Sequence, residues 1–404
     1  MCRVVITGHG AVSAFGLGAS VLWQNVREGR GGIRPLDHAE SASLRVSVAA
    51  QVPHFDAASH FDEKQLPLLD RFTQFALLAA REAVTESGID FSVDGLAERT
   101  AVIVGSAVGG ELTRDEQSRR LYAEQSTRMH PLTIPRAMIN APSSHISMEH
   151  GLTGPAFAVA SACASSNHAI AQAVQTIRSG LADAAIAGGT EACFSVGNLR
   201  AWEAMRVLAD DTCRPFSRNR RGLVLAEGAA MFVLESLEHA QARGAVILAE
   251  LAGFGMSSDA GDIVAPSDVG AARSMRQALA NAKLGSADID YINAHGTGTQ
   301  ANDATETRAI RNVFGADANR LAVSSTKSMH GHALGASGAL ELIAVIGALR
   351  DGIVPPTANY TDPDPACDLD VVPNVARSMP VRAALTNSFA FGGLNSTLVL
   401  RRAS

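Results

Sequence analysis

The chain has 404 residues, 47% of them hydrophobic and 18% charged, with a formal net charge of -6. A chain of this length and apolar content can bury a large core, and two structural units are expected. The acidic balance gives no overall positive field, which argues against nucleic acid or an anionic membrane surface as a partner.

The cysteines and the apolar runs of the sequence indicate where in the cell the protein is expected. The cysteines are few, scattered and odd in number, namely Cys2, Cys163, Cys193, Cys213 and Cys367. This argues against a disulfide framework and against closely spaced zinc ligands, so a cytoplasmic location is expected. The opening segment 3–8 predicts a strand and a glycine turn instead of an export signal. The apolar run 340–349 is interrupted by Glu341 and is far shorter than the roughly 20 residues that cross a bilayer.

Short segments rich in Val, Ile and Ala alternate with helical patterns along the chain. Most of them end in Gly or Ser, which predicts the buried strands of an α/β fold. In chain order the predicted strands are 4–7, 101–104, 157–161, 184–187, 230–234, 247–251, 291–293, 321–324, 384–386 and 397–400. The long stretches 37–69 and 113–140 are interpreted as insertions that form a cap or a dimer contact.

The order of motifs runs twice. In the first half, strand 157–161 leads to Cys163 and a helix, and strands 184–187 and 230–234 follow. In the second half, strand 321–324 leads to Lys327 and His332, and strands 384–386 and 397–400 follow. A charged helix ending at Gly244 marks the join. The sequence therefore predicts two similar halves, residues 1–245 and 246–404, each placing reactive side chains at strand ends, where open α/β sheets bind ligands.

Cys163 stands between a strand and a helix that begins with small and polar residues. The N-terminal end of a helix favours thiolate over thiol, and a thiolate is the nucleophile needed for thioester exchange. A lone Cys among Ala and Ser is by itself more often a small core residue, which is the interpretation kept for the other four cysteines.

His295 and His332 each follow a strand and are surrounded by small residues. Two neutral imidazoles that donate N–H to a thioester oxygen could hold the enolate formed when a malonyl carboxylate leaves as carbon dioxide. A hydrogen-bonded core position is the usual fate of a histidine and is expected for His168 and His330. A zinc site of Cys163, His295, His330 and His332 is the less favoured alternative, because His-Gly-His is not a usual zinc spacing.

Two further groups could support these side chains. Lys327 and Glu341 could form a buried pair, with Asp303 and Glu306 nearby, that orients the histidines and tunes their protonation. The glycines of 389–393 could bring backbone N–H groups close to a ligand oxygen as an oxyanion hole, although spacing alone equally allows a tight turn.

With these residues in place, the sequence resembles the β-ketoacyl-acyl-carrier-protein synthases, especially the chain-elongating type II form. The resemblance covers nearly the whole chain and rests on motifs in family order, among them Asp70-Arg71-Phe72, Ala162-Cys163-Ala164-Ser165, Gly188-Gly189-Thr190-Glu191, Asn293-Ala294-His295-Gly296-Thr297, Ser325-Thr326-Lys327-Ser328, Gly331-His332 and Asn387-Ser388-Phe389.

The resemblance implies a thiolase-type fold in five αβαβα layers, a homodimer and a decarboxylative condensation of malonyl-carrier protein with an acyl chain held on Cys163. His295 and His332 would assist decarboxylation, supported by Lys327 and Glu341. The backbone N–H groups of Cys163 and of Phe391, the gating residue, would form the oxyanion hole. Substrate contacts are implied for Val108, Trp202, Thr297, Thr299, Phe389, Gly392 and Gly393, and carrier-protein contacts for Lys64 and Arg206. No bound cofactor is implied, since the phosphopantetheine arm arrives on the carrier protein; a structural monovalent cation is compatible.

Several positions differ from the housekeeping pattern, namely Ala390, Leu394, His330, Arg221 and the segment 257–264. Some of these features resemble synthases of specialised acyl chains, such as those of nodulation factors or aryl polyenes. The alternatives are a thiolase, which would need a second cysteine where Phe391 stands, and a non-elongating chain-length partner, which would lack the nucleophile. A heterodimer with such a partner is the alternative assembly.

Overall fold

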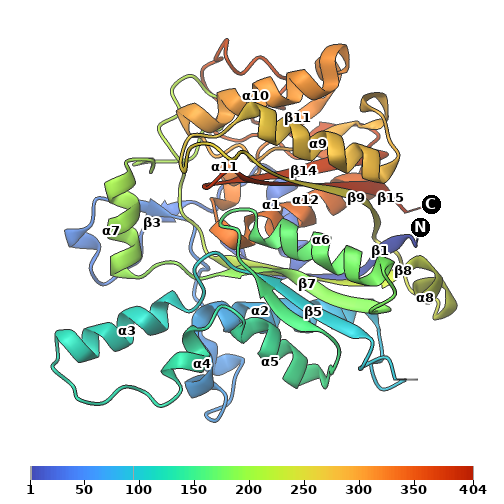
Figure 1. Ribbon diagram of the computed structural model, residues 1–404. Coiled ribbons are helices and arrows are strands. Elements are labelled where there is room, and N and C mark those ends of the chain that lie inside the picture. Colours follow the sequence, from blue (N-terminus) through green and yellow to red (C-terminus); the bar gives the residue numbers. More distant parts are fainter. Residues whose placement is uncertain (1, 94, 404) are drawn as a thin grey trace.

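The computed structural model describes residues 2–93 and 95–403, and its helices and strands form five layers (Figure 1). The strands of the first half are β1 (Val4–Ser13), β5 (Thr100–Gly105), β6 (Ala156–Val159), β7 (Ala184–Glu191) and β8 (Gly228–Ser236). Those of the second half are β9 (Ala249–Ser258), β10 (Tyr291–Asn293), β11 (Ala322–Ser324), β14 (Ala383–Ala390) and β15 (Leu394–Arg402). All ten predicted strands are present.

The two halves have the same topology, as the repeated motif order predicts. The first sheet runs β6-β5-β7-β8-β1 and the second runs β11-β10-β14-β15-β9. In each half the first three of these strands are parallel and the fourth is antiparallel to its neighbours. β1 also pairs with β9, so the two sheets share one hydrogen-bonded ladder.

The helices form the other three layers, and each buries its apolar side on a sheet. The outer layers are α2 (Arg71–Ser87) with α5 (Ala141–His150), and α9 (Asp268–Ala282) with α10 (Gln300–Phe314). The central layer is α6 (Ser165–Arg178) with α12 (Ser337–Asp351) between the sheets. α12 has 13 of its 15 residues buried, which explains why its sequence is apolar on all sides. The predicted αβαβα arrangement is confirmed.

Short elements complete the chain. The helices are α1 (Ala19–Arg27), α3 (Glu111–Tyr122), α4 (Thr133–Ala137), α7 (Val196–Met205), α8 (Leu237–Ala242) and α11 (Lys327–His330). The strands are β2 (Gly16–Leu17), β3 (Arg34–Pro35), β4 (Val48–Ala49), β12 (Ile353–Val354) and β13 (Arg377–Ser378). α8 ends before Gly244 as predicted, with a positive φ of 70° at that glycine. The division into two domains at residue 245 stays a prediction.

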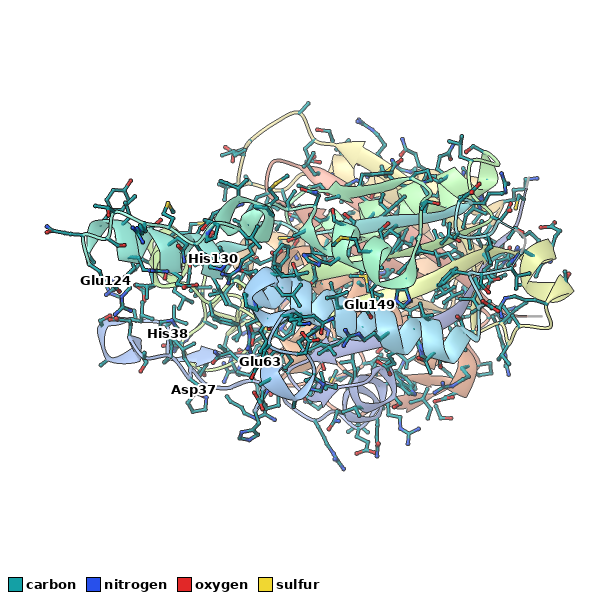
Figure 2. All side chains as sticks on the ribbon, turned by 90° about the horizontal axis from the view of Figure 1, so that it is seen from below. Asp37, His38, Glu63, Glu124, His130 and Glu149 are labelled. Atoms are coloured by element: carbon teal, nitrogen blue, oxygen red, sulfur yellow. The ribbon has the colours of Figure 1, made fainter. Side chains whose placement is uncertain are left out.

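Parts of the two segments interpreted as insertions lie on the same side of the molecule. In Figure 2, Asp37 and His38 of the first segment and Glu124 and His130 of the second are all on the left. The second segment carries α3 and α4, which project from the sheets in Figure 1. None of the described helices has the length and apolar character needed to cross a bilayer.

One strand differs from its prediction. β6 was expected to be buried, but Ala156 and Phe157 are exposed, because β6 is the edge strand and pairs only with β5. Its apolar composition therefore leaves an exposed patch at the sheet edge.

Candidate active site

Cys163 is presented by a tight turn between β6 and α6. The turn is held by Ser165, whose Oγ accepts from the Ser161 N–H at 2.9 Å and donates to the Ala162 carbonyl at 2.7 Å. Ala162 has a φ of 48°, a left-handed backbone conformation that residues other than glycine rarely adopt. This turn brings Cys163 to the start of α6, as predicted.

The protonation of Cys163 differs from the prediction. The thiol is only 6% exposed. Burial raises the pKa of the Cys163 thiol to about 12, and the nearby Lys327 charge only partly opposes this. Burial therefore disfavours the thiolate that the start of the helix was predicted to favour.

His295 follows β10 and is held on both sides. Its backbone N–H and that of Gly296 each donate to Glu306 at 2.8 Å. Lys327 Nζ donates to the His295 carbonyl at 2.7 Å and lies 3.3 Å from His295 Nδ1. Because an ammonium can only donate, Nδ1 is the acceptor and the ring hydrogen sits on Nε2.

His332 reaches the same tautomer through different partners. Its Nδ1 accepts from the Leu334 N–H at 3.1 Å and lies 2.7 Å from the Ser337 hydroxyl. A backbone N–H can only donate, so the His332 hydrogen is also on Nε2. Backbone hydrogen bonds from Ala226 to the His332 carbonyl and from His332 to the Val224 carbonyl hold the residue against the neighbouring segment.

The cysteine and the two histidines meet at one point. One side-chain atom of each residue lies within 4.8 Å of the others, and the two imidazole rings are 5.4 Å apart and nearly perpendicular. All three side chains are buried. Burial, followed by the Lys327 charge, places the pKa of His295 and of His332 well below the ordinary value, so both rings are neutral N–H donors.

The other side chains predicted around the site are also resolved. His330 bonds to Thr326 Oγ1 and to the Gly331 carbonyl, which is the structural role expected for it. Within residues 2–93 and 95–403, only Cys163, His295 and His332 have metal-ligating geometry, but the Lys327 ammonium next to His295 disfavours a cation there. Lys327 and Glu341 form the predicted pair, and both are fully buried. Burial raises the pKa of Glu341 and of Glu306 to about 7.

A cavity of about 110 Å³ opens onto the three residues. Of the predicted substrate residues, Trp202, Thr297, Thr299 and Phe389 line it, as does Phe391, the predicted gating residue. The structure adds wall residues that were not predicted: Val207, Leu223, Val264, Pro266, Ala301 and Asn302. The wall is mainly apolar, with the hydroxyls of Thr297 and Thr299 2.9 Å apart as a polar element.

Three predicted substrate residues lie off this cavity. Val108 packs behind it, in an apolar cluster with Trp202 and Leu334. Gly392 and Gly393 belong to the loop beside it, where the Gly392 N–H donates to the Ile263 carbonyl at 2.8 Å and the Gly393 carbonyl accepts from Asp259 N at 2.9 Å. The backbone of the glycines thus fixes the loop that carries Phe391.

The two predicted carrier-protein residues are on the surface. Lys64 lies in the loop before α2 and is exposed. Arg206 ends α7, is exposed and directly precedes Val207 of the cavity wall. Arg221, one of the positions that differs from the family pattern, is also exposed and pairs with Asp210 at 3.4 Å.

Among the described residues, several buried side-chain oxygen atoms of the second half have no hydrogen-bond partner. They are Asn293 Oδ1, Glu341 Oε2, Thr386 Oγ1, Ser388 Oγ and Ser396 Oγ. Asn293 and Thr386 are register partners on neighbouring strands, and Ser388 lies two residues along the same face. Such a set of oxygen atoms is suited to a hard cation.

Comparisons with known proteins agree with this geometry. Residues 1–240 match the N-terminal domain of β-ketoacyl synthases and residues 248–361 match the C-terminal domain. Nodulation protein E of Rhizobium sp. (strain N33) is 51% identical, and 3-oxoacyl-[acyl-carrier-protein] synthase 2 of Coxiella burnetii is 42% identical; each alignment covers at least 98% of both chains. The solved ishigamide ketosynthase/chain length factor superposes with a TM-score of 0.95, 37% identity and full coverage of both chains. The chain therefore belongs to the β-ketoacyl synthase family and is an acyl-transferring condensing enzyme.

Proposed function

We propose that this enzyme elongates acyl chains by condensing malonyl-carrier protein with an acyl group held on Cys163. The observation that carries the proposal is the shared tautomer of His295 and His332. Both Nδ1 atoms are acceptors, so both rings direct an Nε2–H into the cavity that contains Cys163. Two neutral donors beside a thiol are suited to holding an enolate oxygen.

The reaction follows in three steps. The Cys163 sulfur attacks the acyl thioester, the carbon–sulfur bond to the carrier arm breaks, and the arm leaves as a thiol with the cysteine proton. The malonyl carbon–carbon bond then breaks, carbon dioxide leaves, and the electron pair becomes an enolate whose oxygen accepts from His295 and His332. Finally the enolate carbon attacks the acyl carbonyl and the bond to Cys163 breaks, and the departing thiolate takes up a proton from solvent to restore the thiol. Backbone N–H groups of Cys163 and Phe391 would stabilise the intermediate oxyanion.

The test uses two substitutions of the nucleophile. Cys163→Ala should abolish acyl transfer from carrier protein while the protein still folds. Cys163→Gln should retain malonyl decarboxylation without condensation. Cys193→Ala is the matched control, because Cys193 is equally buried but bonds to the Ala226 carbonyl and does not line the cavity. Product masses from a panel of acyl-carrier proteins identify the chain. Condensation by either Cys163 variant would disprove the proposed role.

The carrier protein would dock where the cavity opens. The Coxiella relative is named for an acyl-carrier protein, and exposed Arg206 and Lys64 could meet its acidic surface. Arg206→Glu should raise the KM for carrier-bound substrate without changing unfolding temperature. Arg402→Glu is the control, because the C-terminus lies on the opposite side of the molecule from α7 in Figure 1. If Arg206→Glu and Arg402→Glu have the same KM for carrier-bound substrate, docking at Arg206 is contradicted.

We infer that two copies of the chain associate through the edge of β6 and the α3–α5 region. The support is a set of exposed large apolar residues in this part of the sequence, Tyr122, Met129, Leu132, Ile134, Met138, Met148 and Phe157. Phe157→Asp should give a monomer in sedimentation velocity, whereas Val246→Asp, at a 75% exposed site elsewhere, should not. A parent chain that is monomeric alone, and dimerises only with a chain-length partner, would replace this inference with the heterodimer.

We also propose that a monovalent cation binds unpartnered buried oxygen atoms of the second half. It would be held by Asn293, Glu341, Thr386 and Ser388, and would compensate the second oxygen of Glu341. Potassium or sodium chloride should raise the unfolding temperature more than choline chloride at equal ionic strength. Thr386→Val should reduce that difference. Equal stabilisation by all three salts would exclude the cation.

A further inference from the structure

Glu191 is a buried carboxylate that the proposed mechanism does not use. It ends β7 and has no exposed surface. Among the described residues, its hydrogen-bond partners are backbone N–H groups and one hydroxyl, and no basic side chain pairs with it. Burial raises the pKa of Glu191 to about 7. A buried carboxyl group without a partner of opposite charge is destabilising compared with an apolar residue, so its presence calls for another explanation.

The two oxygen atoms of Glu191 hold two separate segments together. Oε1 accepts from the Ser106 hydroxyl at 2.9 Å and from the Val108 N–H at 3.2 Å. Oε2 accepts from the Ala107 N–H at 2.8 Å and from the Gly335 N–H at 3.0 Å. One carboxylate therefore joins the segment 106–108, which follows β5, to the turn 334–336, which follows His332.

Each of these segments supports a different part of the reaction. Ala107 and Val108 belong to the apolar cluster that packs behind the cavity-lining Trp202. The turn begins with Leu334, whose N–H sets the tautomer of His332. The two segments touch closely, since a Cβ on Gly335 would come within 2.5 Å of Ala107 N.

We propose that Glu191 is a positioning residue that fixes segment 106–108, which packs with the cavity-lining Trp202, and the turn after His332 in one arrangement. The inference rests on the roles proposed above for Cys163 and His332. Glu191 touches no reacting atom; it acts through the backbone of Val108 on the apolar cluster that includes the cavity-lining Trp202, and through Gly335 and Leu334 on His332. A change at this one residue therefore alters both half-reactions.

Two substitutions should have different effects. In Glu191→Gln the amide nitrogen cannot accept, and it is best placed facing Ser106, whose hydroxyl can turn to accept from it. Val108 then loses its acceptor, while Ala107 and Gly335 keep theirs. In Glu191→Leu all four donors lose their acceptor. The Gln variant should disturb mainly segment 106–108, and the Leu variant should disturb both this segment and the turn 334–336.

The half-reactions are measured separately. Acylation of Cys163 is followed by intact mass with short and long acyl-carrier proteins, and decarboxylation is followed in a Cys163→Gln background. Both Glu191 variants should change the ratio of long-chain to short-chain acylation, by about threefold or more. Glu191→Leu should also lower decarboxylation about tenfold or more, as expected for a displaced catalytic ring, and Glu191→Gln should lower it less.

Glu235 offers the matched control. It is also a fully buried carboxylate, but its partners are Thr7, His239 and Arg243, none of which lines the cavity. Glu235→Gln should lower the unfolding temperature without changing either half-reaction. If the Glu191 variants behave in the same way, Glu191 has only a structural role and the proposal is wrong.

If a Glu191 variant does not fold, a second pair of substitutions tests the same proposal. Ser106→Ala removes one donor and should change chain preference alone, whereas Gly335→Ala pushes on both segments and should change both half-reactions. Unchanged half-reactions in this pair would equally refute the proposal. A parent enzyme that forms no β-ketoacyl product would instead refute the proposed function, which separates the two failures.

Discussion

Burial of the nucleophile predicts an unusual pH dependence for its reaction with a small alkylating agent. Because burial raises the pKa of the Cys163 thiol from an ordinary value of 9.0 to about 12, the thiolate fraction at pH 7 is lower by roughly a thousandfold. The thiolate is the reacting species. The alkylation rate should therefore rise about tenfold for each pH unit from pH 7 to pH 9.5, without reaching a plateau.

The assay follows iodoacetamide labelling of Cys163 by peptide mass spectrometry at several pH values. Cys2, which is partly exposed, serves as the internal reference in each sample. Lys327→Met should slow the labelling of Cys163 at every pH, because the Lys327 charge favours the thiolate, whereas Lys64→Met should not. A rate that is already constant between pH 7 and pH 9 would show that the end of α6 outweighs burial.

Three other predictions concern the loop, the histidine and a distant carboxylate. Gly393→Ala should slow condensation more than Gly392→Ala. Both glycines have a positive φ, but only a Cβ at position 393 would clash, since it would come within 2.5 Å of the Asp259 Cβ. Equal condensation rates for the two variants would contradict this. Ser337→Ala should lower decarboxylation only a few-fold, since the Leu334 N–H still holds His332 Nδ1, and a complete loss would contradict that tautomer. Burial raises the pKa of Glu235, but hydrogen bonds from Arg243 and Thr7 bring it below the ordinary value. Its stabilisation is therefore present above the ordinary pKa and lost as pH falls, so Glu235→Gln should destabilise by about 2 kcal/mol at pH 7 and by less at pH 4 in urea unfolding.

The fold was largely predictable because its strands carry local signals. Runs of β-branched and small residues, most of them ending in Gly or Ser, marked all ten strands, and their repeated order indicated the two halves. β6 was misjudged as buried because the burial of a strand depends on its neighbours in the sheet, which its own composition does not encode.

The sequence predicted the reactive residues of the candidate site but not the distant contacts and the packing that surround them. His295 and His332 follow β10 and β11, which are neighbouring parallel strands, so their ends lie side by side. Cys163 follows β6 in the other half, and the packing of the two halves brings it to the histidines. The contact between Glu191 and Gly335 spans 144 residues, and no local pattern indicates it. The pKa of Cys163 was misjudged for a similar reason: the helix end is visible in sequence, whereas the surrounding apolar packing is not.

The pairing of β1 with β9 has a mechanical consequence. Because Val4 to Ile6 bond directly to the strand that begins the second half, the two halves cannot swing apart as rigid bodies without breaking backbone hydrogen bonds. Substrate entry must then depend on small loop displacements. Either half produced alone would expose the unpaired backbone groups of β1 or β9, and such a strand edge is prone to self-association.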